Sequence, residues 1–325
     1  MSKVRRSHFL ALAAGTIPVL SSLERALAAD APSTVTIAYQ PGIAYAALIV
    51  MKWQHALEKR FPGSAFKWNI LANGDAVRTG IIANQIQFGA GGGGPFLIGW
   101  DRGVGYRLVG GLSVFDLWLV SRDPKIKTLK DVKPDMKVGM PSPDSFQAVI
   151  FRKGCAEQLG DPHALDSNIV SIPHPLGVAA LQNGQIALHL SSPPFQNEEV
   201  AAGGHIVMRS YQYFPNATFT SVETSKEIAK QYPALMKGFY EELSAATKFV
   251  NSNHAATAKF LEEESQGKVS AAKFERYLDL KGVAYSSVPQ GFIEIATFMH
   301  QIGMIHKVPS SIDAIELSML HGMGS

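Results

Sequence analysis

Two segments about a hundred residues apart share one order of residue types. Near its end, each contains a run of small residues that could hold a ligand. The segments are Asn84–Phe96 and Asn183–Phe195. Each predicts a helix end, a turn, a short strand, a run of Gly or Ser, and a Pro that can open the next helix. Exposed N–H groups and hydroxyls at a helix N-terminus favour anions and polar ligand atoms. The repeat therefore predicts two binding loops on two similar halves, with a ligand held between them.

Four loops that follow predicted strands carry these small or polar residues, and aromatic residues stand at the same strand ends. Ligands of open α/β sheets bind outside the carboxyl ends of the strands, and aromatic side chains there could stack on a planar or apolar ligand. Ordinary turn and capping chemistry explains any one of these loops, whereas four at equivalent strand ends indicate a site. The candidate ligand-binding residues are Tyr39, Gln40, Tyr45, Gly92, Gly93, Trp118, Ser142, Ser145, Phe146, Ser191, Ser192 and Phe195. The four loops contain no Arg, so helix N-termini are the expected partners of an anion.

Catalytic and metal-binding motifs have little support. The pattern Gly89-x-Gly91-x-x-Gly94 fits the dinucleotide-binding fingerprint, and Asp116 lies about 20 residues further on. A run of four glycines fits many patterns by chance, however, and this one follows the third strand. There is no Gly-x-Ser-x-Gly elbow and no His-Glu-x-x-His, and the acidic run Glu262–Glu264 is typical of a solvated helix face. We expect no enzyme activity, no cofactor and no metal; the alternative of another class is an exported NAD(P)-dependent oxidoreductase that uses Gly89–Gly94.

Residues 1–28 are typical of a signal peptide. Lys3, Arg5 and Arg6 precede the apolar run 9–20, and Ala26–Ala28 is a small-x-small cleavage site. The apolar run is shorter than the roughly 20 residues that a membrane span needs. The sequence therefore predicts export to the periplasm, and the Arg pair leaves the general and the twin-arginine routes both open.

Charge and cysteine content narrow the class further. Residues 1–28 hold four basic residues and one acidic residue, a net +3, and the whole chain is also +3, so the mature chain is close to neutral. No nucleic-acid partner is expected. Cys155 is the only cysteine, which excludes an internal disulfide and favours a small buried apolar residue. We expect a freely soluble monomer.

Predicted strands and helices alternate from Thr34 to about Tyr211, and the remainder is rich in helices. This alternation predicts an α/β protein with two lobes, each a mainly parallel sheet flanked by helices, and a hinged cleft between them. Lobe 1 is expected to comprise 29–117 and 210–325, and lobe 2 to comprise 118–209.

Several short motifs, through their order and spacing, resemble the nitrate/taurine/sulfonate class of periplasmic solute-binding proteins of ABC importers. The motifs are Thr36–Gln40 with Ala44–Tyr45, Gly80–Gly89, Gly103–Val109, Leu129–Lys133 and Ala179–Ile186. The resemblance implies the two-lobed periplasmic binding protein fold, which closes on a small ligand, often a sulfonate, nitrate or pyrimidine. It also implies delivery of that ligand to a membrane permease. The chain departs from the class in its four-glycine run and in lacking Arg in the presumed cleft loops. Related pyrimidine-synthesising enzymes carry a Cys-rich iron motif, and a single Cys argues against that activity here.

The sequence thus predicts the solute-binding subunit of an ABC importer, with a small-molecule ligand and a membrane permease as its partners. A small organic anion of sulfonate type is favoured as the ligand. A pyrimidine-like or other heteroaromatic molecule is the alternative within the same role.

Overall fold

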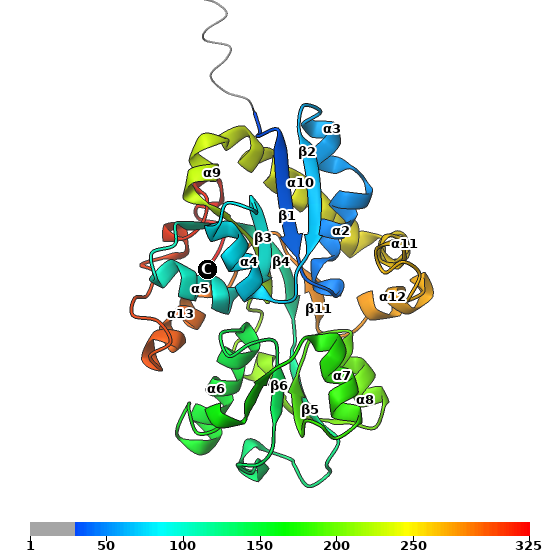
Figure 1. Ribbon diagram of the computed structural model, residues 1–325, viewed down its shortest axis with the longest axis vertical. Helices are drawn as coiled ribbons and strands as arrows, with labels where there is room; N and C mark the ends of the chain where they lie inside the picture. The colour runs from blue at the N-terminus through cyan, green and yellow to red at the C-terminus, as the bar shows by residue number, and fades with distance from the viewer. Residues whose placement is uncertain (1–29) are drawn as a thin grey trace, which may run out of the picture.

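The computed structural model describes residues 30–325, and two β-sheets organise it. We call the six-stranded sheet with its helices lobe 1 and the five-stranded sheet with its helices lobe 2; they lie at the top and bottom of Figure 1. The predicted signal peptide lies outside the described residues. No helix in the described part of the chain is long and apolar enough to cross a membrane.

The sheet of lobe 1 has the strand order β11-β4-β10-β3-β1-β2. Its strands are β1 (Thr34–Tyr39), β2 (Ala65–Ile70), β3 (Phe88–Gly92), β4 (Tyr106–Phe115), β10 (Thr220–Ser225) and β11 (Val283–Tyr285). β1 is parallel to β2 and β3, whereas β10 is antiparallel to both β3 and β4. The start of β10 therefore reaches the sheet edge at which β3 ends.

The sheet of lobe 2 has the order β7-β6-β8-β5-β9. Its strands are β5 (Trp118–Ser121), β6 (Val138–Met140), β7 (Ile169–Ser171), β8 (Leu188–Leu190) and β9 (His205–Arg209). β6 is parallel to β7 and β8, while β5, which enters from lobe 1, is antiparallel to β8 and β9. The predicted α/β fold with two helix-flanked sheets is confirmed. The sheets are mixed rather than mainly parallel, however, because the strands near the crossings run antiparallel to their neighbours.

Helices cover both sheets (Figure 1). Those of lobe 1 are α2 (Ala46–Trp53), α3 (Ala56–Arg60), α4 (Gly74–Ile82), α5 (Gly93–Asp101), α9 (Lys226–Gln231), α10 (Pro233–Ser252), α11 (His254–Glu264), α12 (Ala271–Leu278) and α13 (Phe292–Gln301). Those of lobe 2 are α6 (Phe146–Leu159), α7 (His174–Gln182) and α8 (Phe195–Ala201). Short 3₁₀ turns span Ile43–Tyr45, Leu129–Asp131, Asp166–Asn168, Ser210–Gln212, Ile312–Ala314 and Ser318–Leu320.

Side-chain caps begin two of the helices that face the junction of the lobes. The Asn73 side chain accepts a hydrogen bond from the Ala76 N–H at 3.0 Å at the start of α4. The Ser145 hydroxyl accepts one from the Ala148 N–H at 3.2 Å at the start of α6. Such caps satisfy N–H groups that the first turn leaves unpaired. Cys155 is fully buried, as predicted, and burial raises the pKa of its thiol to about 12.

A buried carboxylate fixes the place where the chain crosses between the lobes. Asp116 follows β4 and is 1% exposed. Its Oδ2 accepts hydrogen bonds from the Trp118 indole N–H at 2.9 Å and from Arg209 Nε at 2.7 Å, and its Oδ1 accepts one from the Tyr211 N–H at 3.3 Å. Both crossing segments therefore meet on this side chain. The exact lobe boundaries, 117/118 and 209/210, stay a prediction.

Replacing this carboxylate tests its part in stability. Asp116→Ala removes a buried acceptor shared by the Trp118 indole, the Arg209 guanidinium and the Tyr211 N–H, so we expect it to lower the free energy of unfolding by about 2–4 kcal/mol. Chemical denaturation measures the change. Asp135→Ala, at an exposed position, should change stability by less than about 0.5 kcal/mol; equal effects of the two substitutions would contradict the assignment.

Candidate functional site

A cavity lies between the two lobes, and both contribute to its walls. It encloses about 460 Å³ of empty space that opens to solvent. The lining residues are Gln40, Pro41, Ala44, Tyr45, Gly74, Gly92, Pro95, Pro141, Ser142, Ser145, Phe146, Gln147, His174, Ser192 and Phe219. Apolar walls with a few polar groups are common in small-molecule sites.

The first turns of three helices face this cavity. Gly74 begins α4, Pro95 lies in the first turn of α5, and Phe146 begins α6, and all three line the cavity. N–H groups of a first turn have no partner within their helix, and the helix dipole places partial positive charge there. The Ser145 hydroxyl, by contrast, is already used, since it donates to the Ser142 carbonyl at 2.6 Å and caps α6. The cavity can thus offer N–H donors to a polar or anionic group.

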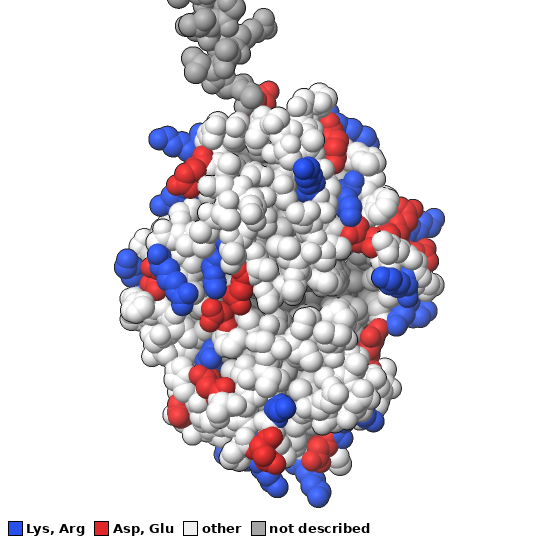
Figure 2. Space-filling view, in the orientation of Figure 1, with Lys and Arg blue, Asp and Glu red and all other residues white. Residues whose placement is uncertain are grey.

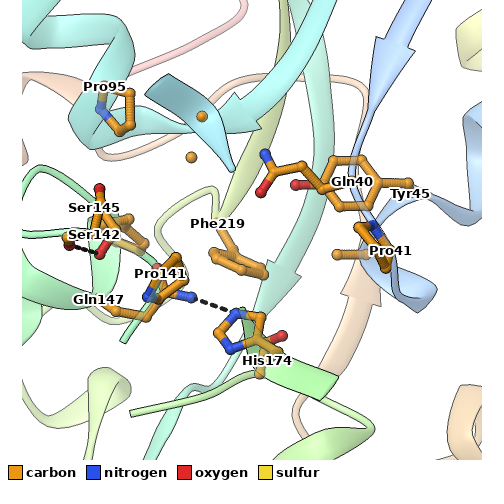
Figure 3. Close-up of a pocket in the computed structure, with 15 residues that line it drawn as sticks. Gln40, Pro41, Tyr45, Pro95, Pro141, Ser142, Ser145, Gln147, His174 and Phe219 are labelled. Atoms are coloured by element: carbon orange, nitrogen blue, oxygen red, sulfur yellow. Dashed lines mark hydrogen bonds between the residues drawn. The ribbon is translucent and has the colours of Figure 1, made fainter. Parts of the chain in front are cut away.

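Two amides and one imidazole supply the other polar groups. Gln40 Nε2 donates to the Ala90 carbonyl at 3.2 Å, which fixes the amide at the end of β1. The Gln147 amide donates to His174 Nε2 at 3.1 Å, and His174 Nδ1 lies 3.4 Å from the Ser191 hydroxyl. Figure 3 shows Phe219 among Gln40, Gln147 and His174. The site therefore combines one aromatic face with amide and imidazole edges.

The cavity walls carry no fixed charge. Among the described residues, none that lines it is Lys, Arg, Asp or Glu, and Figure 2 shows a hollow between the lobes whose floor is neither blue nor red. Burial, followed by the neighbouring His189, lowers the pKa of His174 to about 3, so its imidazole is neutral at physiological pH. Arg78 approaches from the edge, but its guanidinium binds Asp75 at 3.1 Å and Asp144 at 3.6 Å. A ligand here meets dipoles and N–H groups rather than a formal cation.

Glycines let the lobes approach closely at the cavity. A Cβ on Gly94 would lie 2.6 Å from the Asp144 carbonyl oxygen and 3.1 Å from the Phe146 nitrogen. A Cβ on Gly92 would lie 3.2 Å from the Phe146 Cβ. These contacts join α5 to the start of α6, that is, lobe 1 to lobe 2. The glycine run thus lets two backbones pack together, and it does not form the separate loop expected from the sequence, because β3 passes directly into α5.

A buried pair lies behind His174 in lobe 2. His189 Nδ1 and Glu199 Oε1 are 2.5 Å apart, and both side chains are fully buried. Burial lowers the pKa of His189 to about 3 and raises that of Glu199 to about 8. Neutral His189 therefore accepts a hydrogen bond from the protonated carboxyl of Glu199. This pair and the rings of His174 and Phe195, which stack on each other at 5.6 Å, support the lobe 2 wall without adding charge.

The structure brings some of the sequence-predicted site residues together and separates others. Those that line the cavity are Gln40, Tyr45, Gly92, Ser142, Ser145, Phe146 and Ser192. Tyr39 and Phe195 line an adjoining pocket, and Ser191 lies behind His174. Gly93 packs against Phe292 instead, with a hypothetical Cβ 3.2 Å from that ring. Trp118 lies at the hinge, where its indole binds Asp116.

Sequence reasoning missed several lining residues, chiefly Gln147, His174 and Phe219. His174 follows β7 and begins α7, so the rule on strand carboxyl ends could have found it. Gln147 is the residue after a predicted one. Phe219 precedes β10, and its place depends on the antiparallel direction of that strand, which no local pattern indicates.

The dinucleotide alternative finds no support in this geometry. A Cβ on Gly89 would lie 2.3 Å from Val77 Cγ1, so this glycine serves the packing of α4 on the sheet. Asp116, the expected ribose ligand, is bound to Arg209 and Trp118 at the hinge. The residues that the structure describes also contain no group of three His, Cys, Asp or Glu placed to hold a metal ion.

Comparison with known proteins agrees with this architecture. The family model of the NMT1-like family matches residues 28–262. The alkanesulfonate-binding protein SsuA from Xanthomonas axonopodis pv. citri, solved bound to MOPS, is 18% identical with a TM-score of 0.72, covering 90% of this chain and 99% of its own. The periplasmic nitrate-binding protein NrtA from Synechocystis PCC 6803 is 15% identical with a TM-score of 0.71, covering 90% and 86%.

A third solved structure is described as having the generic periplasmic binding protein fold. It is the CA3427 gene product of Candida albicans, 13% identical with a TM-score of 0.63, covering 90% of this chain and 96% of its own. No curated protein matches by sequence. At these identities the likeness shows the fold, and the two-lobed fold predicted from the sequence is confirmed.

The buried carboxyls predict how stability depends on pH. Burial raises the pKa of Glu199 and of Glu223 to about 8, from 4.5. Between these values the folded chain holds protons that the unfolded chain has released, so stability falls as pH rises through this window. His174 and His189 act in the opposite sense only below pH 6.5. From pH 6.5 to 8 we expect each carboxyl to lower the free energy of unfolding by about 1.4 kcal/mol per pH unit.

Denaturation curves at several pH values measure this slope. Glu199→Gln removes one carboxyl while keeping a donor for His189. The slope of the unfolding free energy against pH should then be smaller by the contribution of one proton, about 1.4 kcal/mol per pH unit. Glu294→Gln, at an exposed position, should leave the slope as it is. A slope unchanged in Glu199→Gln would contradict the protonated state of the pair.

Proposed function

The chain belongs to the NMT1-like family, and from that premise we propose that it is the periplasmic solute-binding subunit of an ABC importer. One observation carries the proposal: a cavity walled by both lobes, lined by polar groups without fixed charge, at the junction of a two-lobed fold. Proteins of this architecture bind a ligand between lobes that close around it. Similar solved structures include proteins described as alkanesulfonate-binding and nitrate-binding, which supports the transport role.

The ligand that we propose is a small organic anion with a single negative charge, with a sulfonate group favoured. The first turns of α4, α5 and α6 face the cavity, and helix N-termini bind such groups without a cation. Ser192 and the amide of Gln147 add neutral donors. A group with two charges would find no countercharge on the walls, and its desolvation would be unfavourable.

A planar heteroaromatic molecule such as a pyrimidine is the second candidate. The observation that favours it is the Phe219 ring, which lies among the amides of Gln40 and Gln147 and the imidazole of His174 (Figure 3). Amides offer both a donor and an acceptor, which complements the edge of such a ring while the aromatic face stacks on it.

The remaining parts of the proposal concern location and partners. The signal peptide predicted in residues 1–28 supports export to the periplasm, and a membrane permease is the partner that would receive the ligand. We propose that the chain acts as a monomer and that it catalyses no reaction.

A thermal-shift screen of the mature chain tests the ligand class. Ligands that bind only the folded state raise the midpoint of unfolding, so we expect a shift with short sulfonates and none with divalent anions. Gln147→Ala should then weaken binding at least tenfold, about 1.4 kcal/mol, in calorimetric titration, whereas Gln158→Ala, outside the cavity, should leave binding unchanged. A shift with pyrimidines alone would select the second candidate, and no shift with any class would remove the proposal.

Closure of the lobes on the ligand predicts a specific effect at the glycine contact. Gly94→Ala places a Cβ against the Asp144 carbonyl, so we expect at least tenfold weaker ligand binding and a larger radius of gyration in solution scattering. The fold of lobe 1 should remain, since the contact is with lobe 2. Gly63→Ala is the matched control because its Cβ would meet no atom within 4 Å. Unchanged affinity in Gly94→Ala would contradict closure at this contact.

A further inference from the structure

A second pocket adjoins the cavity, and we propose that it binds an apolar tail of the transported ligand. The substrate class would then be amphiphilic: a small polar head between the lobes and an alkyl or aryl tail beside it. This inference rests on the proposed function, because it assigns the head group to the cavity described above.

Most of the second pocket is apolar. It encloses about 780 Å³ of empty space open to solvent. Its apolar lining residues are Tyr39, Pro41, Ile49, Ile70, Pro194, Phe195, Leu261, Val269, Phe274 and Tyr277. Ile70 is 52% exposed, although it ends a strand of the lobe 1 sheet. Burial of such surface by a ligand tail is favourable in proportion to the apolar area removed from water.

The second pocket borders the cavity. Gln40 and Pro41 line both spaces, and Gly42 follows them with φ of 121°. A Cβ on Gly42 would lie 3.5 Å from the Phe195 ring, so the loop after β1 lies against α8 of lobe 2. A ligand whose head contacts Gln40 in the cavity can therefore extend its tail past this loop.

Both lobes also close the second pocket. Glu198 of α8 accepts hydrogen bonds from Lys273 Nζ at 2.8 Å and from the Tyr277 hydroxyl at 2.5 Å, both on α12. α11 and α12 lie beside the junction of the lobes, on the right in Figure 1. The tail would be enclosed by the same closure that encloses the head, which couples the two parts of the site.

The charged groups at the rim are paired within the protein. Glu264 was expected on a solvated helix face, but its side chain is only 10% exposed. It binds Lys52 at 2.6 Å and the Trp53 indole at 3.0 Å, and it also accepts from the Tyr39 hydroxyl. That expectation is corrected, since the last turn of α11 packs against α2 and β1. With Glu198 and Glu264 both held by lysines, the pocket favours an uncharged tail over a cationic one.

A homologous ligand series tests the inference. For n-alkanesulfonates from methyl to octyl, we expect calorimetric affinity for the mature chain to rise about fourfold per buried methylene. Ile70→Asp puts a charge in the second pocket at a half-exposed position, so octanesulfonate should bind at least tenfold more weakly while methanesulfonate stays within twofold. Ile82→Asp is the matched control, because Ile82 is 56% exposed and lies outside both spaces. Val269→Trp, which fills the pocket, should reproduce the effect of Ile70→Asp.

The outcomes separate this inference from the proposed function. Methanesulfonate that binds without any gain from chain length would overturn the inference and leave the function standing, as would a gain that persists in both pocket variants. If no head group binds, the function falls, and the uncharged fluorophore N-phenyl-1-naphthylamine then reports on the pocket alone. Its binding to the wild type and not to Ile70→Asp would support an apolar site, and no binding to the wild type would overturn it.

Discussion

The close approach of two backbones at the junction of the lobes is the constraint on which the site depends. α5 of lobe 1 and the start of α6 in lobe 2 pack with no room for a Cβ between Gly94 and the Asp144 carbonyl. Because both are helix N-terminal segments, the approach brings the partial positive charge of two helix N-termini to one cavity. The lobes can approach because the glycine run has no side chains. Side chains at these positions would hold the lobes apart and separate the helix N-termini of α5 and α6.

Burial keeps the titratable groups in and behind the cavity wall uncharged. His174 stays neutral because a protonated imidazole would lose its hydration with no carboxylate beside it. The pair behind it, His189 with Glu199, is neutral because burial disfavours the charged form of each group. Charged pairs instead lie at the edges, where Arg78 meets Asp144 and Glu198 meets Lys273 across the lobes. Ions thus link the lobes at the rim while dipoles line the interior, an arrangement that suits a weakly charged ligand.

Much of the fold could be predicted from the sequence, but the site only in part. Strand and helix periodicity and capping residues such as Asn73 are local signals, and they predicted the α/β class correctly. The rule on strand carboxyl ends found Gln40, Ser142 and Ser192. It could not find Phe219, which reaches the site from the start of an antiparallel strand. Trp118, chosen for its place at the predicted hinge, lies there and binds Asp116, and it does not line the cavity. The burial of Glu264 could not be predicted either, because it depends on packing between helices far apart in sequence.

The two adjoining spaces imply different contributions to binding. N–H groups and amides orient a polar head, yet each hydrogen bond replaces one made with water, so the net gain per bond is small. Burial of an apolar tail in the second pocket exchanges no hydrogen bonds, and its favourable free energy increases with the apolar area removed from water. Closure joins the two, because α8 supplies Phe195 to the pocket and Glu198 to the bond across its rim. A ligand with both parts would favour the closed arrangement more than either part alone, since closure removes its tail from water at the same time as it completes the polar contacts.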